Sequence, residues 1–146
     1  MNSGENKRKH LQLIQDVITR MGGNSFLLKG WSISIITALV GFALTSDSEK
    51  DRAVLLIIAM VLVLMFWLLD SYYLSQERMY RGLFGEVRKK NEDQIDYSLD
   101  ARHHNTGYNT WTSAMTSHVF LIFYVPVLLI LLLVCSNLIG INVYIK

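Results

Sequence analysis

The sequence predicts an all-α membrane protein with three transmembrane helices, the second extended into the cytoplasm, and an N-terminal amphipathic helix. Hydrophobic residues make up 51% of the 146 positions, and they are concentrated in blocks rather than dispersed as in a soluble domain. A helix rises about 1.5 Å per residue and the hydrocarbon core is about 30 Å thick, so roughly 20 apolar residues cross a bilayer. The blocks that approach or reach this length are Phe26–Thr45, Ala53–Leu69 and Val119–Ile139.

Residues 1–25 form a predicted N-terminal tail and amphipathic helix. Over His10–Met21 the apolar residues recur at three- and four-residue spacing, with polar residues between them. We expect Gly22 and Gly23 to end or bend this helix, and Asn24 or Ser25 to cap the next one. The helix should lie either on the membrane surface or against a neighbouring helix. The polar residues that precede the first span, and the lack of a small-residue cleavage site after it, favour a retained span over a signal peptide.

The first span, residues 26–45, carries small residues at four- and three-residue spacing, which let another helix backbone approach closely in lipid. We call them the small-residue face, although small residues also occur in membrane helices without making a contact. Lys29 and Trp31 suit the membrane interface, where an ammonium group can reach water. Residues 46–52 form a predicted outer turn. The members of the small-residue face are Gly30, Ser34, Ala38 and Gly41.

The second span, residues 53–74, runs without a proline into the charged stretch SQERMYRGLFGEVRKK. The apolar period stays helical there, and Gly82 and Gly85 weaken the helix without ending it. We therefore expect one helix from about Ala53 to Lys90. Beyond the span it carries an interaction stripe that needs a partner, which the N-terminal helix can supply in part and a second subunit or another protein can complete. The interaction stripe consists of Tyr73, Tyr80, Phe84 and Val87.

Asp70 is an ionisable residue at the end of the second span, where such groups are candidates for function. Lys29 lies about one turn inside the corresponding end of the first span. Antiparallel spans place the two at similar depth, so we expect a structural Lys29–Asp70 ion pair within the membrane. A solvated interfacial carboxylate and a pore-lining one are the alternatives.

Residues 75–117 form a predicted helical arm followed by a loop, in which the polar segment after residue 90 is either a structured loop or a short helix with a turn. The third span, residues 118–140, contains Pro126, which should kink the helix and free a backbone carbonyl. Residues 141–146 are a predicted outer tail. Cys135 lies alone inside this span and cannot form a disulfide within the chain.

Lysine and arginine placement predicts the orientation of the chain. Basic residues gather before the first span and between the second and third spans, whereas the 46–52 turn has Lys50 and Arg52 beside acidic residues. The N-terminus and residues 75–117 should therefore face the cytoplasm, and the 46–52 turn and the C-terminus the opposite side. Because topology accounts for the net charge of +2, that charge is no argument for nucleic-acid binding.

The sequence contains no catalytic motif, so we expect a protein that is not an enzyme and needs no cofactor. His103 and His104, with Asp100 nearby, could suggest a metal site. Adjacent histidines on a helix point in different directions, and no second ligand pair supports them, so we expect no metal there. An anionic small molecule could contact four basic side chains, although topology explains their charge as well. These side chains belong to Arg78, Arg81, Arg88 and His103.

Three stretches also carry a resemblance to known proteins. They are LQLIQDVITRMGGNSFLLKGWSISIITAL, FWLLDSYYLSQERMYRGLFGEV and FYVPVLL. Together they make the chain similar, over most of its length, to a family of small uncharacterised bacterial multi-span inner-membrane proteins. More loosely, the chain resembles membrane-disrupting effectors of anti-phage defence systems. The resemblance implies a bacterial inner-membrane location and a class of role, but no catalytic residues.

These features predict an oligomeric inner-membrane protein that forms or gates a pore, or perturbs the membrane, on a cytoplasmic signal. Its partners would be the lipid bilayer and further copies of the chain, with no nucleic acid. The alternative is a membrane anchor that recruits a cytosolic partner enzyme through residues 71–117. The oligomeric state distinguishes the two, because a closed ring supports the pore and a monomer or heteromer supports the anchor.

Overall fold

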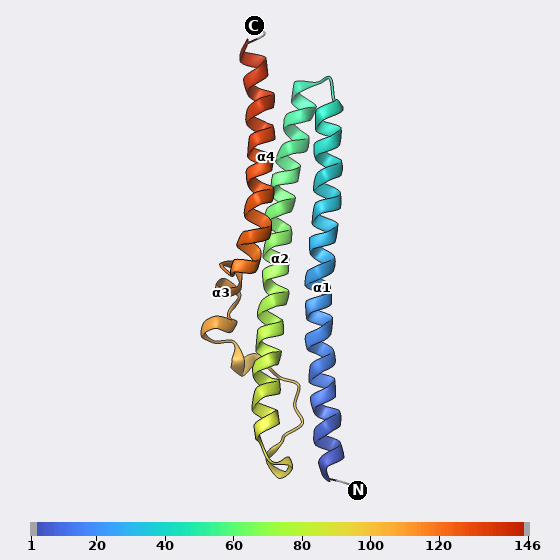
Figure 1. The fold of residues 1–146 in the computed structure, drawn as a ribbon, viewed down its shortest axis with the longest axis vertical. Coiled ribbons are helices and arrows are strands. Elements are labelled where there is room, and N and C mark those ends of the chain that lie inside the picture. Colours follow the sequence, from blue (N-terminus) through green and yellow to red (C-terminus); the bar gives the residue numbers. More distant parts are fainter. Residues whose placement is uncertain (1–2, 145–146) are drawn as a thin grey trace. The chain divides into compact units, whose positions relative to one another are not determined.

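The computed structural model describes residues 3–144, and within them every element is helical (Figure 1). Three long helices are present, α1 (Ser3–Thr45), α2 (Glu49–Lys89) and α4 (His118–Tyr144). The segment between α2 and α4 contains the short helix α3 (Trp111–Met115) and three single 3₁₀ turns. The turns are η1 (Glu92–Gln94), η2 (Arg102–His104) and η3 (Gly107–Asn109).

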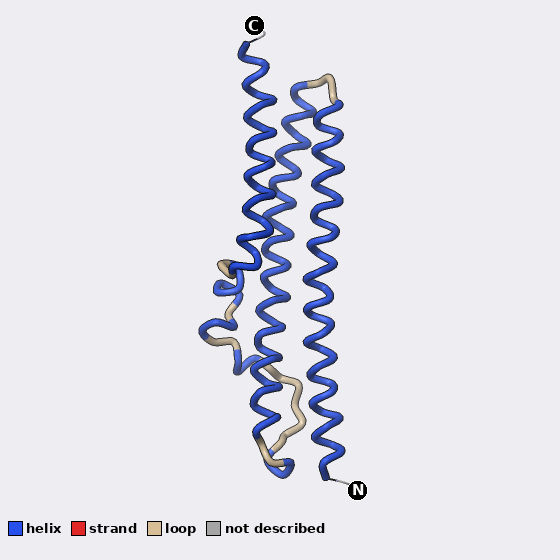
Figure 2. The backbone as a smooth tube through the Cα atoms, in the orientation of Figure 1, coloured by secondary structure: helices blue, strands red, loops and turns tan. Residues whose placement is uncertain are grey.

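Each long helix contains a stretch that is long and apolar enough to cross a membrane, within Gly4–Thr45, Glu49–Lys89 and His118–Asn137. The predicted all-helical fold with three helices able to span a membrane is therefore confirmed. α2 begins in its apolar part and continues through Asp70 to Lys89 as one helix, as expected from the absence of a proline. Between α2 and α4 the tube in Figure 2 alternates between loops and short helical turns, so residues 91–110 form a structured loop.

Gly22 and Gly23 do not end the helix, so that part of the expectation is wrong: α1 is continuous from Ser3 to Thr45. A glycine inside a helix costs about 1 kcal/mol relative to alanine, which packing can offset. Gly22 lies close to α2, where a Cβ added to it would come 3.5 Å from Oε2 of Glu77. Ser25 is consequently no helix cap. Its side chain donates a hydrogen bond to Asp70 instead.

Two predicted boundaries also differ. The turn after α1 is shorter than residues 46–52, because α2 begins at Glu49. Ser48 caps it by accepting a hydrogen bond from the backbone N–H of Asp51 at 3.3 Å, and acidic residues in the first turn suit the positive end of the helix dipole. At the other end of the chain α4 continues past residue 140 to Tyr144. Residues 145–146 of the predicted outer tail lie outside the described residues.

The chain divides into two compact units, and α1 and α2 contribute residues to both. Unit 2 comprises Leu28–Leu69 and Thr116–Lys146 and holds the apolar parts of the three long helices. Its largest fully buried side chains include Phe120, Tyr124 and Leu131 of α4. Several large apolar side chains elsewhere in the unit are more than half exposed, as expected for residues that face lipid. Examples are Ile57, Ile122 and Leu133.

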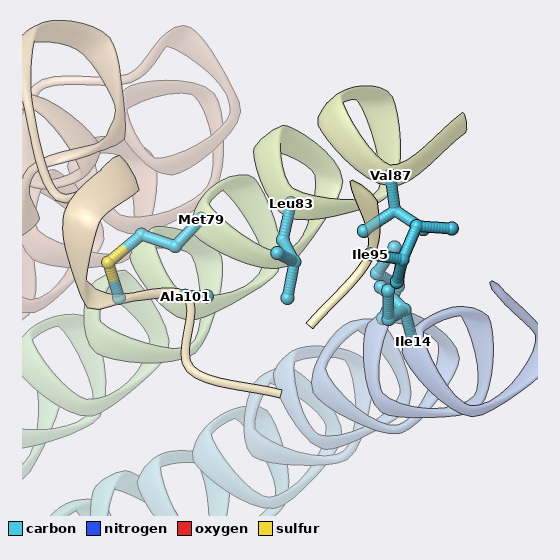
Figure 3. Packing of buried hydrophobic residues seen from close by; sticks show 7 residues of the cluster. Ile14, Met79, Leu83, Val87, Ile95 and Ala101 are labelled. Atoms are coloured by element: carbon cyan, nitrogen blue, oxygen red, sulfur yellow. The ribbon is translucent and has the colours of Figure 1, made fainter. Parts of the chain in front are cut away.

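Unit 1 comprises Met1–Leu27 and Asp70–Met115 and has its own apolar core (Figure 3). The first part of α1 packs on the end of α2, so the N-terminal amphipathic helix lies against a neighbouring helix rather than alone. Leu11, Tyr80 and Phe84 are half-buried against this core. The buried members of the core are Ile14 and Ile18 from α1, Met79, Leu83 and Val87 from α2, and Ile95 and Ala101 from the following loop.

Replacing Ile14 tests whether this core holds unit 1 together. Its side chain is 0% exposed, so Ile14→Ala should lower the free energy of unfolding of unit 1 by about 2–5 kcal/mol, through lost burial and the cavity left behind. Hydrogen exchange of the α1 and α2 amides of unit 1, in detergent, measures the change. Leu13→Ala is the matched control, because Leu13 is 53% exposed and should change exchange little. Equal effects of the two substitutions would contradict this assignment of the core.

Candidate functional site

In unit 1, the N-terminal part of α1 contacts the C-terminal end of α2 through polar groups as well as apolar ones. The ammonium of Lys7 donates hydrogen bonds to the backbone carbonyls of Arg88 and Lys90, at 3.2 and 2.6 Å. Arg88 lies in the last turn of α2 and Lys90 directly follows the helix. Carbonyls at a helix C-terminus lack partners within the helix and favour a cation. The N-terminal part of α1 therefore satisfies the end of α2 as well as burying its apolar face.

A buried polar stripe on α2 receives residues 108–109. Arg78 is 7% exposed, and its guanidinium donates hydrogen bonds to the backbone carbonyl of Tyr108 at 2.9 Å and to the Tyr108 hydroxyl at 2.8 Å. The same guanidinium stacks on the tyrosine ring, 3.7 Å from its centroid. One turn earlier, the Ser75 hydroxyl donates to the backbone carbonyl of Asn109 at 2.7 Å. Each contact satisfies a buried polar group, which would otherwise destabilise the fold.

Three potential ligand side chains meet where the 3₁₀ turn η2 lies against α2. The Nε2 atoms of His103 and His104 each lie 3.0 Å from Oε2 of Glu86. The two imidazole centroids are 4.1 Å apart, and the three ligand atoms lie within 4.8 Å of one another. We call Glu86, His103 and His104 the histidine–glutamate cluster. Among the described residues, this is the group of three His, Cys, Asp or Glu side chains whose ligand atoms lie close enough together to hold a metal ion.

The two histidines differ in how they meet the carboxylate. Nε2 of His103 has hydrogen-bond geometry to Glu86. Nε2 of His104 is at ion-pair distance, but it is buried and has no hydrogen-bond partner among the residues described. The angle explains the difference, because a hydrogen bond needs the N–H to point towards the oxygen and short distance alone is not enough. The Nε2 atom of His104 is thus buried and close to a carboxylate oxygen without a hydrogen bond to it.

Glu86 carries the negative charge of the cluster. Its other oxygen, Oε1, accepts a hydrogen bond from Lys90 at 2.5 Å, one turn further along α2. The hydrogen bonds from Lys90 and then from His103 lower the pKa of Glu86 to about 2. The carboxylate is therefore ionised at neutral pH and offers Oε2 to the two imidazoles.

An open pocket of about 520 Å³ adjoins this cluster. Glu86 and His104 line it together with the basic residues Arg81, Lys89 and Lys90. Gly82 and Gly85 of α2 form part of the wall. The pocket therefore combines a carboxylate–imidazole group with positive charge at its edge.

Gly82 makes room for His104. A Cβ added to Gly82 would come 2.9 Å from both Cγ and Nδ1 of His104, closer than carbon atoms pack. These atoms lie near the base of the histidine side chain, so a small rotation does not remove the contact. Gly85, one turn on, has nothing within 4 Å of the same added atom. The glycine that the sequence shows as a helix weakener is thus needed for the approach of η2.

A second feature of unit 1 is the contact between His10 and Tyr97. The two rings meet edge to face with centroids 5.5 Å apart, and His10 is 3% exposed. Nε2 of His10 has no hydrogen-bond partner among the described residues. Tyr97 has a φ of 55°, in the left-handed region that costs a non-glycine residue about 1–2 kcal/mol. Its hydroxyl donates to Glu92 at 3.3 Å, which helps to hold this turn.

The four basic residues expected around an anionic ligand contact different groups. Arg78 is buried on Tyr108, Arg81 pairs with Glu77 at 2.7 Å, and His103 meets Glu86. Arg88 is exposed at the end of α2. Of the four, Arg81 lines the pocket beside the histidine–glutamate cluster.

Sequence reasoning missed Glu86 because it considered His103 and His104 with Asp100. Asp100 instead binds Arg102, whose guanidinium and backbone N–H both donate to it. The argument that adjacent histidines diverge assumed a helix, whereas both lie on the single turn η2. The sequence does show that Gly82 and Glu86 are four residues apart and so share a face of α2, which places a small residue beside a carboxylate.

Asp70 and Lys29, the expected ion pair, belong to different units, and their pairing stays a prediction. In unit 1, Asp70 is fully buried and accepts a hydrogen bond from Ser25 at 2.5 Å. In unit 2, the ammonium of Lys29 lies over the ring of Phe120, 4.9 Å from its centroid. These two contacts were not expected from the sequence, because neither serine nor phenylalanine is a charge partner.

The remaining predicted residues divide between buried and exposed positions. Of the interaction stripe, Val87 is buried in the core of unit 1, and Tyr73, Tyr80 and Phe84 are half-buried. All four residues of the small-residue face are exposed, and a Cβ added to Gly30 or Gly41 would meet nothing within 4 Å. Pro126 lies inside α4, exposed, without ending the helix.

The fold defines the class of the protein. It is an α-helical membrane protein with three helices able to span a bilayer, and its second helix continues into a separate compact helical unit. Comparison of the chain with protein-family models, with curated proteins and with solved structures finds no match.

The two glycines of the pocket give a paired test of the η2 contact. Gly85→Ala should stabilise α2 by about 0.5–1 kcal/mol, since it restores helix propensity where space is open. Gly82→Ala gains the same propensity but displaces His104, so it should be less stable than Gly85→Ala. Thermal unfolding in detergent measures both. A Gly82→Ala protein as stable as Gly85→Ala would show that His104 does not need the space.

The contact between Arg78 and Tyr108 can be tested by a substitution that keeps the positive charge but removes the planar guanidinium group. Arg78→Lys cannot donate to both oxygen atoms of Tyr108 in the same geometry, so hydrogen exchange at residues 107–110 should accelerate. Tyr108→Phe is the matched milder change, since it removes only the hydroxyl acceptor and should cost about 0.5–1.5 kcal/mol. If exchange in this segment is unchanged in Arg78→Lys, then another contact holds the segment to α2.

Proposed function

We propose that this chain is a membrane protein that self-associates through α1 and forms or gates a permeation path in response to a signal received by unit 1. The observation that carries the proposal is the small-residue face of α1, which is exposed along the apolar part of the helix. Small residues in lipid favour close helix contacts, because they let backbones approach and gain van der Waals contact.

The position of this face on the helix supports a contact with another chain. At 3.6 residues per turn, Gly30, Ser34, Ala38 and Gly41 lie about opposite to the buried positions of the same helix. The buried positions in this part of α1 are Ser32, Ile36 and Ala43. The side of α1 that unit 2 uses for its own packing is therefore separate from the side that carries the small residues.

The core of unit 1 supports self-association over recruitment of a partner enzyme. The interaction stripe was expected to be covered in part by the N-terminal helix, and within unit 1 Val87 is buried while Tyr80 and Phe84 are half-buried against the core. Unit 1 has an open pocket beside the histidine–glutamate cluster, at which a signal could bind.

The setting of the proposed function follows the sequence. The distribution of basic residues favours a cytoplasmic N-terminus and a cytoplasmic unit 1. The resemblance favours a bacterial inner membrane and a role as an effector in anti-phage defence. α1 and α2 contribute to both units, so a change in unit 1 would reach the spans along the same two helices. Loss of membrane potential in expressing cells after phage infection tests this setting.

Ala38→Leu tests the small-residue face directly. The larger side chain keeps the helix apolar but blocks the close approach of another backbone, so the assembly should dissociate in nanodiscs or mild detergent. Light scattering coupled to size-exclusion chromatography measures the mass. Ile33→Phe is the matched control, since Ile33 is exposed on the same helix but lies off the face, and its assembly should persist.

Membrane leakage then separates the outcomes. Dye release from liposomes containing the wild-type chain, lost in Ala38→Leu and kept in Ile33→Phe, would support a path formed by the assembly. A wild-type chain that is monomeric in nanodiscs and leaves liposomes intact would overturn the proposal. A stoichiometric complex with a soluble enzyme, without leakage, would favour the anchor instead.

A further inference from the structure

We propose that Glu86, His103 and His104 of unit 1 form a binding site for a divalent first-row transition-metal ion of the zinc class. The proposal rests on their geometry in unit 1 and holds whether or not the chain self-associates. Two imidazole nitrogens and one carboxylate oxygen are a ligand set that zinc accepts, with a fourth position left for water or another ligand.

The distances fit such an ion. In a tetrahedral site with bonds of about 2.0–2.1 Å, neighbouring ligand atoms lie about 3.3 Å apart. The Nε2 atoms of His103 and His104 are each 3.0 Å from Oε2 of Glu86. All three ligand atoms fall within 4.8 Å of one another, so small side-chain rotations bring them to one ion.

The state of His104 favours a metal ligand over a simple ion pair. Its Nε2 atom is buried and has no hydrogen-bond partner among the described residues, although a carboxylate oxygen lies 3.0 Å away. A buried polar atom without a partner destabilises a fold by about 1–3 kcal/mol. A metal ion between His104 and Glu86 would satisfy this nitrogen through its lone pair, which needs no N–H to point at the oxygen.

The backbone around the cluster is held by other contacts, as an organised site requires. The carbonyl of His104 accepts hydrogen bonds from the Thr106 N–H at 2.8 Å and from the Asn109 side chain at 3.1 Å. Asp100 fixes the start of the turn by binding Arg102. On the other side, Gly82 provides the space in which the His104 ring lies.

Lys90 opposes metal binding and provides a test of it. Its ammonium occupies Oε1 of Glu86 and leaves Oε2 to the histidines, so an ion would bind the carboxylate through one oxygen. The positive charge of this ammonium group would repel a metal ion bound to the same carboxylate. Removing it should therefore strengthen metal binding, whereas it would only weaken a structure that uses the cluster as an ion-pair network.

The experiment is a titration of the full chain in detergent with zinc chloride alone, after removal of any affinity tag and treatment with a chelator. Competition with a chromophoric chelator gives the stoichiometry and affinity. We expect one zinc ion per chain. His103→Gln and His104→Gln should each weaken binding by about 100-fold or more, since even residues that only support a ligand contribute 10- to 100-fold.

Matched variants make the result decisive. His118→Gln removes a histidine of unit 2 and should bind zinc as the wild type does. Lys90→Gln should bind zinc roughly 2- to 10-fold more tightly, because a repelling charge is lost. Circular dichroism confirms that each variant keeps its helices, so that weaker binding is not unfolding.

A second readout concerns the position of the ion. Zinc should slow hydrogen exchange of the amides at 102–105 in the wild type and not in a His103→Gln/His104→Gln protein, because the ion would join η2 to α2. The proposal is overturned if the wild type has no saturable zinc site, or if the double variant binds zinc as tightly as the wild type.

Discussion

The packing of the N-terminal half of α1 on the end of α2 is the interaction on which unit 1 depends. A single amphipathic helix is marginal in water, and α1 also contains Gly22 and Gly23, each costing about 1 kcal/mol. Ile14 and Ile18 bury against Met79, Leu83 and Val87. A fully buried aliphatic side chain contributes about 1.5–3 kcal/mol, so two or three such contacts exceed the cost of the glycines. The helix therefore stays continuous where its sequence alone would break it.

The same core decides where the chain goes after α2. Ile95 and Ala101 complete the apolar cluster, which brings the following residues back along α2. Ser75 and Arg78 then satisfy the carbonyls of Asn109 and Tyr108, and these hydrogen bonds hold the loop beside a polar face of the helix. The histidine–glutamate cluster lies between these two anchors. The apolar contacts before η2 and the hydrogen bonds after it both attach the loop to α2, and together they position η2.

The two units use their surfaces differently. Unit 2 presents apolar side chains outward, as lipid requires, and leaves the small-residue face of α1 uncovered within the chain. Unit 1 buries an apolar core of its own and has an open pocket lined by charged residues beside it. The proposed function combines these two features: a unit with its own core that would receive a signal, and shared helices whose apolar part carries an exposed small-residue face.

The sequence by itself determined the three apolar helices, the continuity of α2 and the amphipathic character of His10–Met21, because length, hydropathy and helical period are local properties. The tertiary structure alone decided that α1 is unbroken, that Ser25 meets Asp70, and that Glu86 joins His103 and His104. Each of these depends on residues far apart in the chain, whose approach is set by how helices pack. Local pattern gives the faces of a helix, but only packing decides what each face meets.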